Sequence, residues 1–255
     1  MIAAILLTAA AAAPDLTICA DRPAKANGTC TVPAGHWQLE VSGVDWARTE
    51  DGASRTDVTS FGQSFIKLGL TDNSDMELIT PAYVRVRGRD MSSSTRNSGV
   101  GDTVVRFKQR LTQADSSLQA ALIAFVKLPT ASHSIGNGKV EGGLAVPLSF
   151  TTKAGPTITI GPEVDATADA DGHGYHPALV NLINVGISPA PRFSLSAELW
   201  NATNFDPAET VHLWSADVAA AYLPTKRVQL DGGANFGLNR ATADVELYVG
   251  ASVLF

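Results

Sequence analysis

Long hydrophobic runs and clusters of basic residues are both missing from this sequence. Beyond the N-terminus no stretch approaches the roughly 18 apolar residues that a transmembrane helix requires. Charged residues make up 17% of the chain, the net charge is −6, and no group of Lys or Arg resembles those that follow nucleic-acid phosphates. These absences argue against a helical membrane protein and against a nucleic-acid partner.

Residues 1–13 are apolar and end in small side chains. This pattern is typical of a secretory signal peptide, although the usual leading Lys or Arg is missing, and the stretch is too short to span a bilayer. We expect cleavage between Ala10 and Ala13.

Cysteine is scarce, and its two copies, Cys19 and Cys30, lie in the segment that follows the expected cleavage site. An oxidising compartment favours a disulfide between them. The alternative is a lipid-attachment site at Cys19, but Ile18 stands where a small residue belongs. We therefore predict a disulfide within a periplasmic N-terminal segment, residues 14–34, that lies under or inside the mouth of the following domain.

The last eleven residues, Val245–Phe255, alternate between apolar and polar side chains. Period-two alternation indicates a strand with different surroundings on its two faces. The strand is long enough to cross a bilayer, and its terminal Phe255 resembles the C-terminal signal of bacterial outer-membrane β-barrels. The implied partners are outer-membrane lipid and the outer-membrane assembly machinery. The alternative is an ordinary edge strand of a soluble sandwich.

Similar alternation recurs along the chain and predicts twelve strands. They cover residues 36–47, 58–70, 75–87, 101–112, 117–129, 139–151, 156–166, 176–188, 192–201, 210–223, 227–239 and 243–255. The connections between them are alternately long and short, apart from a short last one at residues 240–242. Short periplasmic turns and longer extracellular loops are typical of bacterial barrels. The predicted fold is all-β: an antiparallel transmembrane β-barrel of about twelve strands over residues 35–255.

Aromatic side chains on the apolar phase also follow this topology. With the N-terminus periplasmic, five of them fall at the periplasmic ends of their strands, as an interfacial aromatic girdle requires. They are Trp37, Phe150, Phe193, Tyr222 and Phe255. Trp214 and Phe236 fall nearer the outer ends.

Four segments resemble a family of outer-membrane proteins assigned to transport in the MetA pathway of phenol degradation. They are Ile18–Pro23 with Cys30, Gly99–Val105, Ala124–Thr130 and Gly161–Val164. The resemblance implies an outer-membrane barrel of a Gram-negative bacterium that passes aromatic or other hydrophobic compounds. It brings no catalytic residues and no cofactor.

Charged side chains fall mainly on the opposite phase, which would line the lumen. Strands two to five contribute Lys67, Arg85, Arg87, Arg106, Lys108, Arg110 and Lys127. Strands six to twelve contribute Glu141, Glu163, Asp165, Glu198, Asp217, Asp231, Asp244 and Glu246. We predict that a cationic wall, including Arg85, Arg106, Lys108 and Lys127, faces an acidic wall that includes Glu163, Glu198, Asp217 and Asp231. Two readings stay open: a salt-bridged, closed interior and a wet constriction with a transverse field.

Two further groups of residues are weighed as chemical sites. Asp169, Asp171, His173 and His176 crowd one outer loop, but their spacing matches no complete calcium loop, and such loops are commonly solvated turns. For an outer-membrane lipid hydrolase, His133 beside Ser134 and His212 near Asp217 assemble no nucleophile and base. The sequence predicts no metal, no catalytic residue and no enzyme. The leading function is passive uptake of small compounds, and the alternatives are a structural or adhesive barrel with a plugged lumen and a lipid hydrolase.

Overall fold

The computed structural model describes residues 16–255, so the expected signal peptide, residues 1–13, lies outside the described part of the chain. Every regular element in residues 16–255 is a β-strand. A search of the same residues for helices with the length and apolarity of a membrane span finds none.

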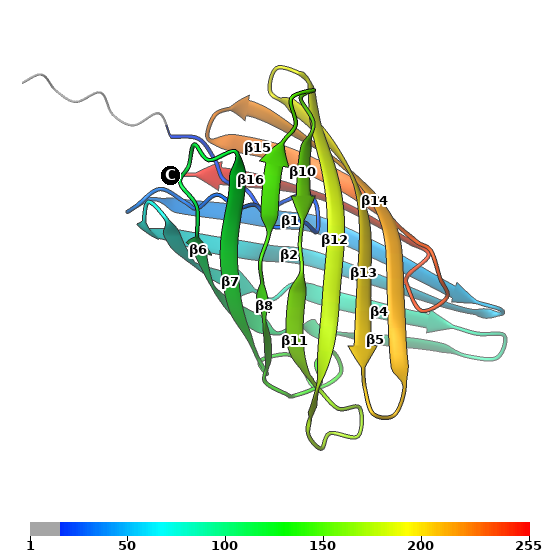
Figure 1. Cartoon of the computed structure of the whole chain (residues 1–255). Coiled ribbons are helices and arrows are strands. Elements are labelled where there is room, and N and C mark those ends of the chain that lie inside the picture. The colour runs from blue at the N-terminus through cyan, green and yellow to red at the C-terminus, as the bar shows by residue number, and fades with distance from the viewer. Residues whose placement is uncertain (1–15) are drawn as a thin grey trace, which may run out of the picture.

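Sixteen hydrogen-bonded stretches form one antiparallel sheet (Figure 1). They are β1 Trp37–Asp51, β2 Ser54–Thr71, β3 Ser74–Thr80, β4 Tyr83–Arg89, β5 Ser94–Val100, β6 Thr103–Arg110, β7 Leu118–Leu128, β8 Glu141–Ala145, β9 Leu148–Thr151, β10 Thr157–Ile160, β11 Glu163–Ala168, β12 Tyr175–Ala190, β13 Phe193–Phe205, β14 Thr210–Thr225, β15 Val228–Gly237 and β16 Val245–Leu254.

These stretches amount to twelve strands around a closed barrel. Four strands are each interrupted once, so that β3 continues into β4, β5 into β6, β8 into β9 and β10 into β11, and each continuation pairs with the same neighbouring strand or its continuation. The barrel closes because β1 pairs with β16 on one side and β2 on the other. The predicted twelve-stranded antiparallel barrel is confirmed.

Prolines account for three of the four interruptions: Pro81, Pro147 and Pro162. Proline has no N–H group to donate to the ladder, so a sheet tolerates it where pairing is broken. The two breaks between β7 and β12 lie side by side and bridge each other, because the Val146 N–H donates to the Pro162 carbonyl over 2.9 Å. Part of the backbone hydrogen bonding that is lost at the two breaks is therefore recovered within the wall.

Two of the long connections expected from the sequence are largely strand. β1 and β2 remain paired from Arg48 with Asp57 out to Asp51 with Ser54, and β4 and β5 remain paired out to Arg89 with Ser94. These two hairpins form a four-stranded sheet that projects from one end of the barrel (Figure 1). We call this end the outer end, and the opposite end, near which the chain ends, the terminal end. The predicted loops at residues 48–57 and 88–99 were therefore wrong in extent.

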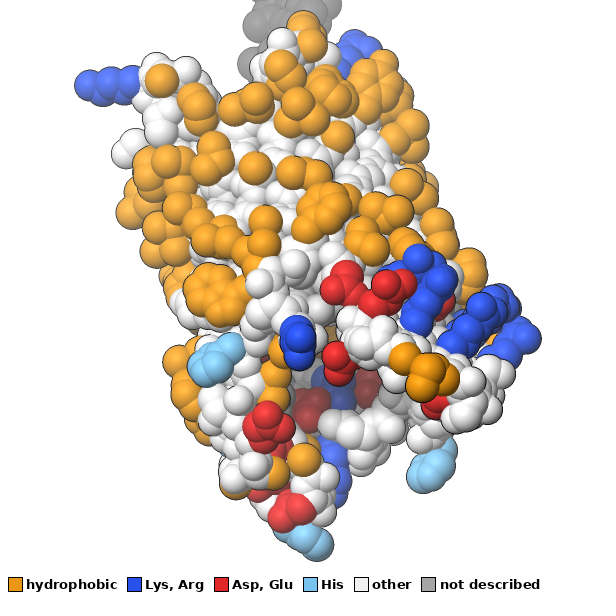
Figure 2. All heavy atoms as spheres, turned by 90° about the vertical axis from the view of Figure 1, so that its right-hand side faces the viewer, with side chains coloured by type: hydrophobic (Ala, Val, Ile, Leu, Met, Phe, Trp, Pro, Cys, Tyr) orange, Lys and Arg blue, Asp and Glu red, His pale blue; other side chains and the backbone are white. Residues whose placement is uncertain are grey.

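The outward face of the barrel is apolar. On β16, Leu247 and Val249 are 47% and 54% exposed, whereas Tyr248 between them is buried. Figure 2 shows hydrophobic side chains around the wall and charged side chains gathered toward one end. The alternation predicted for the last strand is present, and the polar phase fills the interior.

Candidate functional site

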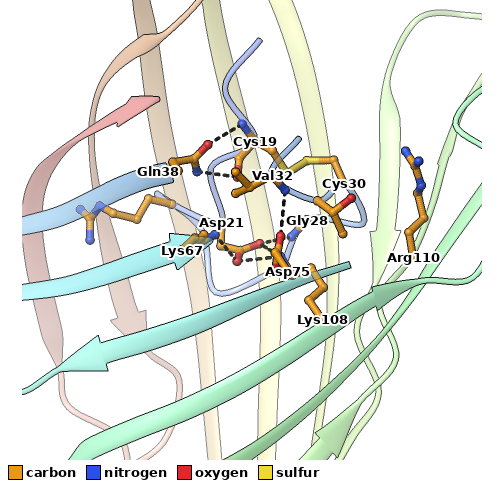
Figure 3. Close-up of a disulfide and its surroundings, with 12 residues drawn as sticks. Cys19, Asp21, Gly28, Cys30, Val32, Gln38, Lys67, Asp75, Lys108 and Arg110 are labelled. Carbon is orange, nitrogen blue, oxygen red and sulfur yellow. Dashed lines mark hydrogen bonds and ion pairs between the residues drawn. A yellow bond between two sulfur atoms is a disulfide. The ribbon is translucent and has the colours of Figure 1, made fainter. Parts of the chain in front are cut away.

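The N-terminal segment, residues 16–36, occupies the terminal end of the lumen. The predicted disulfide is present between Cys19 and Cys30, and Figure 3 shows it surrounded by strands. The Ile18 N–H donates to the Lys226 carbonyl at 2.8 Å, and the Gly35 N–H donates to the Gly69 carbonyl at 2.8 Å. The segment is therefore fixed to the wall near both of its ends.

Asp21 joins this segment to the cationic wall. Its carboxylate lies 2.6 Å from the Nζ atoms of Lys67 and Lys108, both of which are fully buried (Figure 3). Burial alone would raise the pKa of Asp21, but the nearby charges of Lys108, Lys67 and Arg106 outweigh it and hold the pKa well below its usual value. Asp21 is therefore ionised at neutral pH.

Arg22 and Lys25 join the same segment to the acidic wall. The Arg22 guanidinium donates to Asp231 over 2.8 Å, and Lys25 Nζ donates to Asp217 over 2.8 Å. Lys25 also lies 4.7 Å from the centre of the Trp200 ring, a cation–π distance. The segment thus presents its negative charge to one wall and its positive charges to the other.

Backbone groups of the segment are held by side chains of β1. Gln38 pairs with Cys19 in both directions, accepting from its N–H over 3.0 Å and donating to its carbonyl over 2.7 Å. The Asp21 N–H donates to Glu40 over 3.1 Å. Gln38 and Glu40 are buried and have no access to water, so the segment supplies the hydrogen-bond partners that these two side chains need.

Gly69 allows the segment to approach β2 closely. A Cβ atom at this position would lie 2.0 Å from the Pro33 carbonyl oxygen, which is a backbone atom that cannot rotate away. The absence of a side chain on Gly69 therefore permits the segment to seat against the wall.

The two charged walls expected from the sequence do not pair with each other directly at the terminal end. Lys108 bonds Asp21, while Asp217 and Asp231 bond Lys25 and Arg22. The sequence analysis did not identify Asp21, Arg22 and Lys25 as residues that contact the walls. The opposite charges of the adjacent Asp21 and Arg22, in a short stretch bounded by cysteines, could have indicated this role. Arg106 has its own carboxylate on the cationic wall, Glu77, at 3.1 Å.

Three of the residues expected to line the lumen lie elsewhere. Arg85 and Arg87 share the face of Tyr83, which is 44% exposed, whereas Ala82 on the opposite phase is buried. The break at Pro81 shifts the alternation by one residue, and this shift turns both arginines outward. Asp244 precedes β16 in the outer loop, where it is exposed and accepts a hydrogen bond from the Glu50 N–H.

Four of the remaining residues expected in the lumen, Lys127, Glu198, Arg110 and Glu246, each have a polar partner. Lys127 lies 2.7 Å from Glu141 and 3.2 Å from Asp102, and Glu198 accepts from the Ala26 N–H at 2.9 Å. Arg110 donates to the Asp72 carbonyl at the turn before β3, and Figure 3 shows it apart from the Asp21 cluster. Glu246 accepts from Asn235 over 2.6 Å. Asp165 lies on β11 on the same phase as Glu163 and is half-buried.

A cavity of about 500 Å³ lies against the N-terminal segment. Its lining comes from strands all around the barrel, which places it inside the lumen. Four aromatic side chains contribute to it: Phe65, Phe125, Trp200 and Tyr248. Apolar residues including Ile79, Ile123 and Leu182 add to the wall, and Arg106, Glu163 and Glu246 supply charge. The sequence analysis did not identify these aromatic residues as lining the lumen. Their position on the polar phase of their strands could have indicated it.

The crowded outer loop is only partly assembled as a cluster. His176 Nδ1 lies 2.7 Å from Asp169 and 3.7 Å from Asp206, and these three residues could hold a metal ion. Asp171 instead accepts from the His173 N–H, a hydrogen bond typical of a turn. Of the histidines weighed for catalysis, His212 lies 3.1 Å from Thr203 Oγ1 rather than against a serine.

The five aromatics of the expected girdle are at least partly exposed on the outward face. Trp37, Tyr222 and Phe255 are 50%, 46% and 62% exposed. Phe193 lies directly opposite Tyr222, and the Phe255 N–H donates to the Trp37 carbonyl. Phe150 is 37% exposed near the end of β9. All five lie toward the terminal end of their strands.

Solved structures with similar folds are outer-membrane barrels. An outer-membrane channel from Pseudomonas putida F1 superposes with a TM-score of 0.70 at 14% identity, covering 92% of this chain and 99% of that one. The NanC porin gives 0.55 at 11% identity, with 84% and 98% covered. The translocator domain of the autotransporter NalP from Neisseria meningitidis gives 0.55 at 12% identity, with 87% and 89% covered. At these identities the likeness shows the fold, and these neighbours are a channel, a porin and a translocator rather than enzymes.

A search of curated proteins found no match. Residues 20–255, however, match the model of a family described as "Putative MetA-pathway of phenol degradation". The chain belongs to this family, and it has the fold of an outer-membrane β-barrel.

Proposed function

We propose that this protein is a channel for the passive uptake of small aromatic or hydrophobic compounds, with the lumen cavity as the solute site. The observation that carries the proposal is the placement of Phe65, Phe125, Trp200 and Tyr248 on the inward face. A barrel interior that holds only water needs no aromatic side chains, whereas small-molecule sites are mostly apolar with a few convergent polar groups. The family description, which refers to phenol degradation, agrees with such a solute.

Within this proposal, Arg106 and Glu163 give the cavity its polar groups. Both line it, so a solute with one hydroxyl group could exchange a hydrogen bond there while its ring contacts the aromatics. The N-terminal segment borders the same cavity through Asp21 to Lys25 and Asn27. The segment therefore limits the size of the compound that passes toward the terminal end.

The test is to fill the cavity. Ile123 is buried on the inward face of β7, and Val126 on the same strand is 44% exposed on the outward face. Ile123→Trp should lower the uptake of phenol into proteoliposomes by at least tenfold, while Val126→Trp should leave it unchanged. Circular dichroism and the heat-dependent gel shift would verify that both variants fold. Equal uptake by the two variants would contradict the proposal.

A plugged structural or adhesive barrel is the second candidate, because buried ion pairs fix the N-terminal segment in place. Liposome swelling separates the two functions. A wild-type protein that admits no solute, together with an Asp21→Asn variant that does, would favour the plugged barrel. Flux of small aromatic compounds through the wild-type protein would favour the channel.

The C-terminal strand has features that suit contacts with the outer-membrane assembly machinery and with lipid. Phe255 is 62% exposed and ends a row of outward apolar side chains on β16. We propose that the outer-membrane assembly machinery recognises this row before the barrel closes and that the outward aromatics afterwards contact the lipid interface. Phe255→Ala should lower the amount of folded protein in the outer membrane, whereas Phe205→Ala, at the outer end of β13, should not.

A further inference from the structure

Six arginines share one face of the four-stranded sheet that projects from the outer end. In an antiparallel sheet, residues directly opposite each other point to the same side. The register aligns Arg48 with Asp57, Asp57 with Arg87 and Arg87 with Arg96. We call this surface the arginine face, and it comprises Arg48, Arg55, Arg85, Arg87, Arg89 and Arg96.

The arginine face is continuous with the lipid-contacting face of the barrel. The register aligns Phe61 with Tyr83 and Tyr83 with Val100, and these side chains are 38%, 44% and 43% exposed. Arg87 lies four residues beyond Tyr83 on the same phase, which is about 13 Å along the strand and less along the membrane normal because barrel strands tilt. The arginines therefore lie at the depth of the lipid headgroups.

Few carboxylates balance this charge. Asp57 accepts from Arg48 at 2.9 Å and from Arg55 at 2.9 Å, and Glu50 is the other acidic residue on the face. Within residues 16–255, no ion pair or hydrogen bond joins Arg85, Arg87, Arg89 or Arg96 to a carboxylate. The face carries six positive and two negative charges.

The arrangement places like charges directly against each other. Arg87 lies opposite Arg96, and Arg55 lies opposite Arg89. Like charges at directly opposed positions destabilise a sheet, so a bound anion beside the two pairs would stabilise this one. Arginine is suited to phosphate because its planar fork makes two parallel hydrogen bonds, and clusters of basic residues beside a membrane bind anionic headgroups.

We propose that the arginine face binds the phosphate groups of a phosphorylated glycolipid in the outer leaflet. The lipid's acyl chains would lie along Phe61, Tyr83 and Val100, one to two rows closer to the bilayer centre. The positive charge of the arginine face favours a phosphorylated headgroup. The apolar surface that adjoins it favours a lipid over a soluble anion. This inference is independent of the solute that the lumen carries.

The test uses the detergent-purified protein and bisphosphorylated lipid A, followed by native mass spectrometry. Arg87→Gln with Arg96→Gln should weaken binding at least tenfold, and lipid A lacking both phosphates should bind the wild-type protein at least tenfold more weakly. Arg227→Gln is the matched control, because Arg227 is exposed in the turn between β14 and β15 at the terminal end, the end opposite the arginine face, and the variant should bind like the wild type. The gel shift and circular dichroism verify folding.

Thermal melting gives a second readout whose sign is distinctive. Without lipid A, the double substitution should raise the melting temperature because it removes a repulsion; with lipid A it should lower the melting temperature relative to the wild type. Unchanged binding by the double variant would overturn the proposal. Equal affinity for phosphatidylglycerol vesicles would also overturn it, since the face would then be a general anionic-lipid surface.

Discussion

Asp21 and Arg22 are adjacent in the chain, yet their side chains bind opposite walls of the barrel. Asp21 reaches Lys67 and Lys108 on β2 and β6, while Arg22 reaches Asp231 on β15. Two neighbouring residues thus tie the N-terminal segment across the lumen.

Asp21→Asn should loosen the N-terminal segment. Lys108 would lose the carboxylate that lies 2.6 Å away, whereas Lys67 would keep Glu40 at 2.5 Å. Breaking a buried pair by removing one partner typically costs about 3–5 kcal/mol. We expect a conductance increase in planar bilayers with an unchanged gel shift. Asp115→Asn, in an exposed turn at the same end, is the control, and an unaltered conductance in both variants would contradict the prediction.

Reduction of the Cys19–Cys30 disulfide should expose the segment to protease. The bond closes a short loop, and closing a loop of about 15 residues contributes about 3 kcal/mol on a chain-entropy model. Trypsin should cleave after Lys25 much faster in Cys19→Ser with Cys30→Ser than in the wild type, because Lys25 is otherwise held by Asp217. Mass spectrometry of the fragments measures the rate. Equal rates would show that the hydrogen bonds and ion pairs suffice without the disulfide.

Gly69→Ala should displace the segment without disturbing the barrel. The new methyl group would meet the Pro33 carbonyl oxygen at 2.0 Å, and backbone atoms cannot move aside independently. Gly43→Ala is the matched control, because its Cβ would meet the nearest atom, the Val249 carbonyl oxygen, at an ordinary 3.6 Å. Protection of the Cys30–Gly35 amides from hydrogen exchange should fall in the first variant. Retained protection would mean that β2 yields instead.

The attachment of the N-terminal segment to the wall should withstand moderate acid. The pKa of Asp21 is depressed in the folded state, so its stabilising contribution is fully present above the unfolded value of about 3.9 and is lost as the pH falls through the lower folded value. Conductance should therefore stay constant from about pH 8 to pH 5 and rise only well below pH 4. In Asp21→Asn this acid-dependent step should disappear. A rise between pH 5 and pH 7 in the wild type would assign control to another group.

The sequence predicts where the strands lie better than it predicts which side chains of each strand face the lumen. Alternation identifies the apolar row of Leu247 and Val249 because each face of a barrel strand meets one solvent along its whole length. Arg85 was misplaced because alternation was extended through Pro81, where the ladder is broken and the phase shifts. Proline inside an expected strand is a visible signal of such a break.

The interior could be predicted only in part. The inward phase of Arg106 and Lys108 follows from local alternation, but their partner Asp21 comes from a segment with no periodicity at all. The disulfide-bounded stretch before the first strand is predicted to lie under or inside the mouth of the barrel, but its individual contacts could not be predicted, because its partners are scattered over β1, β2, β6, β13, β14 and β15. The aromatics of the cavity, such as Trp200, were visible as apolar residues on a polar phase.

The ties between the N-terminal segment and the acidic wall also impose an order on assembly. Arg22 and Asp231 are 209 residues apart, and Lys25 and Asp217 are 192 residues apart. The segment is made first, but these partners exist in place only when the last strands have joined the wall, and such distant contacts form late because their loop-closure entropy must be offset by the rest of the fold. Residues 16–36 are therefore expected to settle into the lumen late, after the last strands have joined the wall.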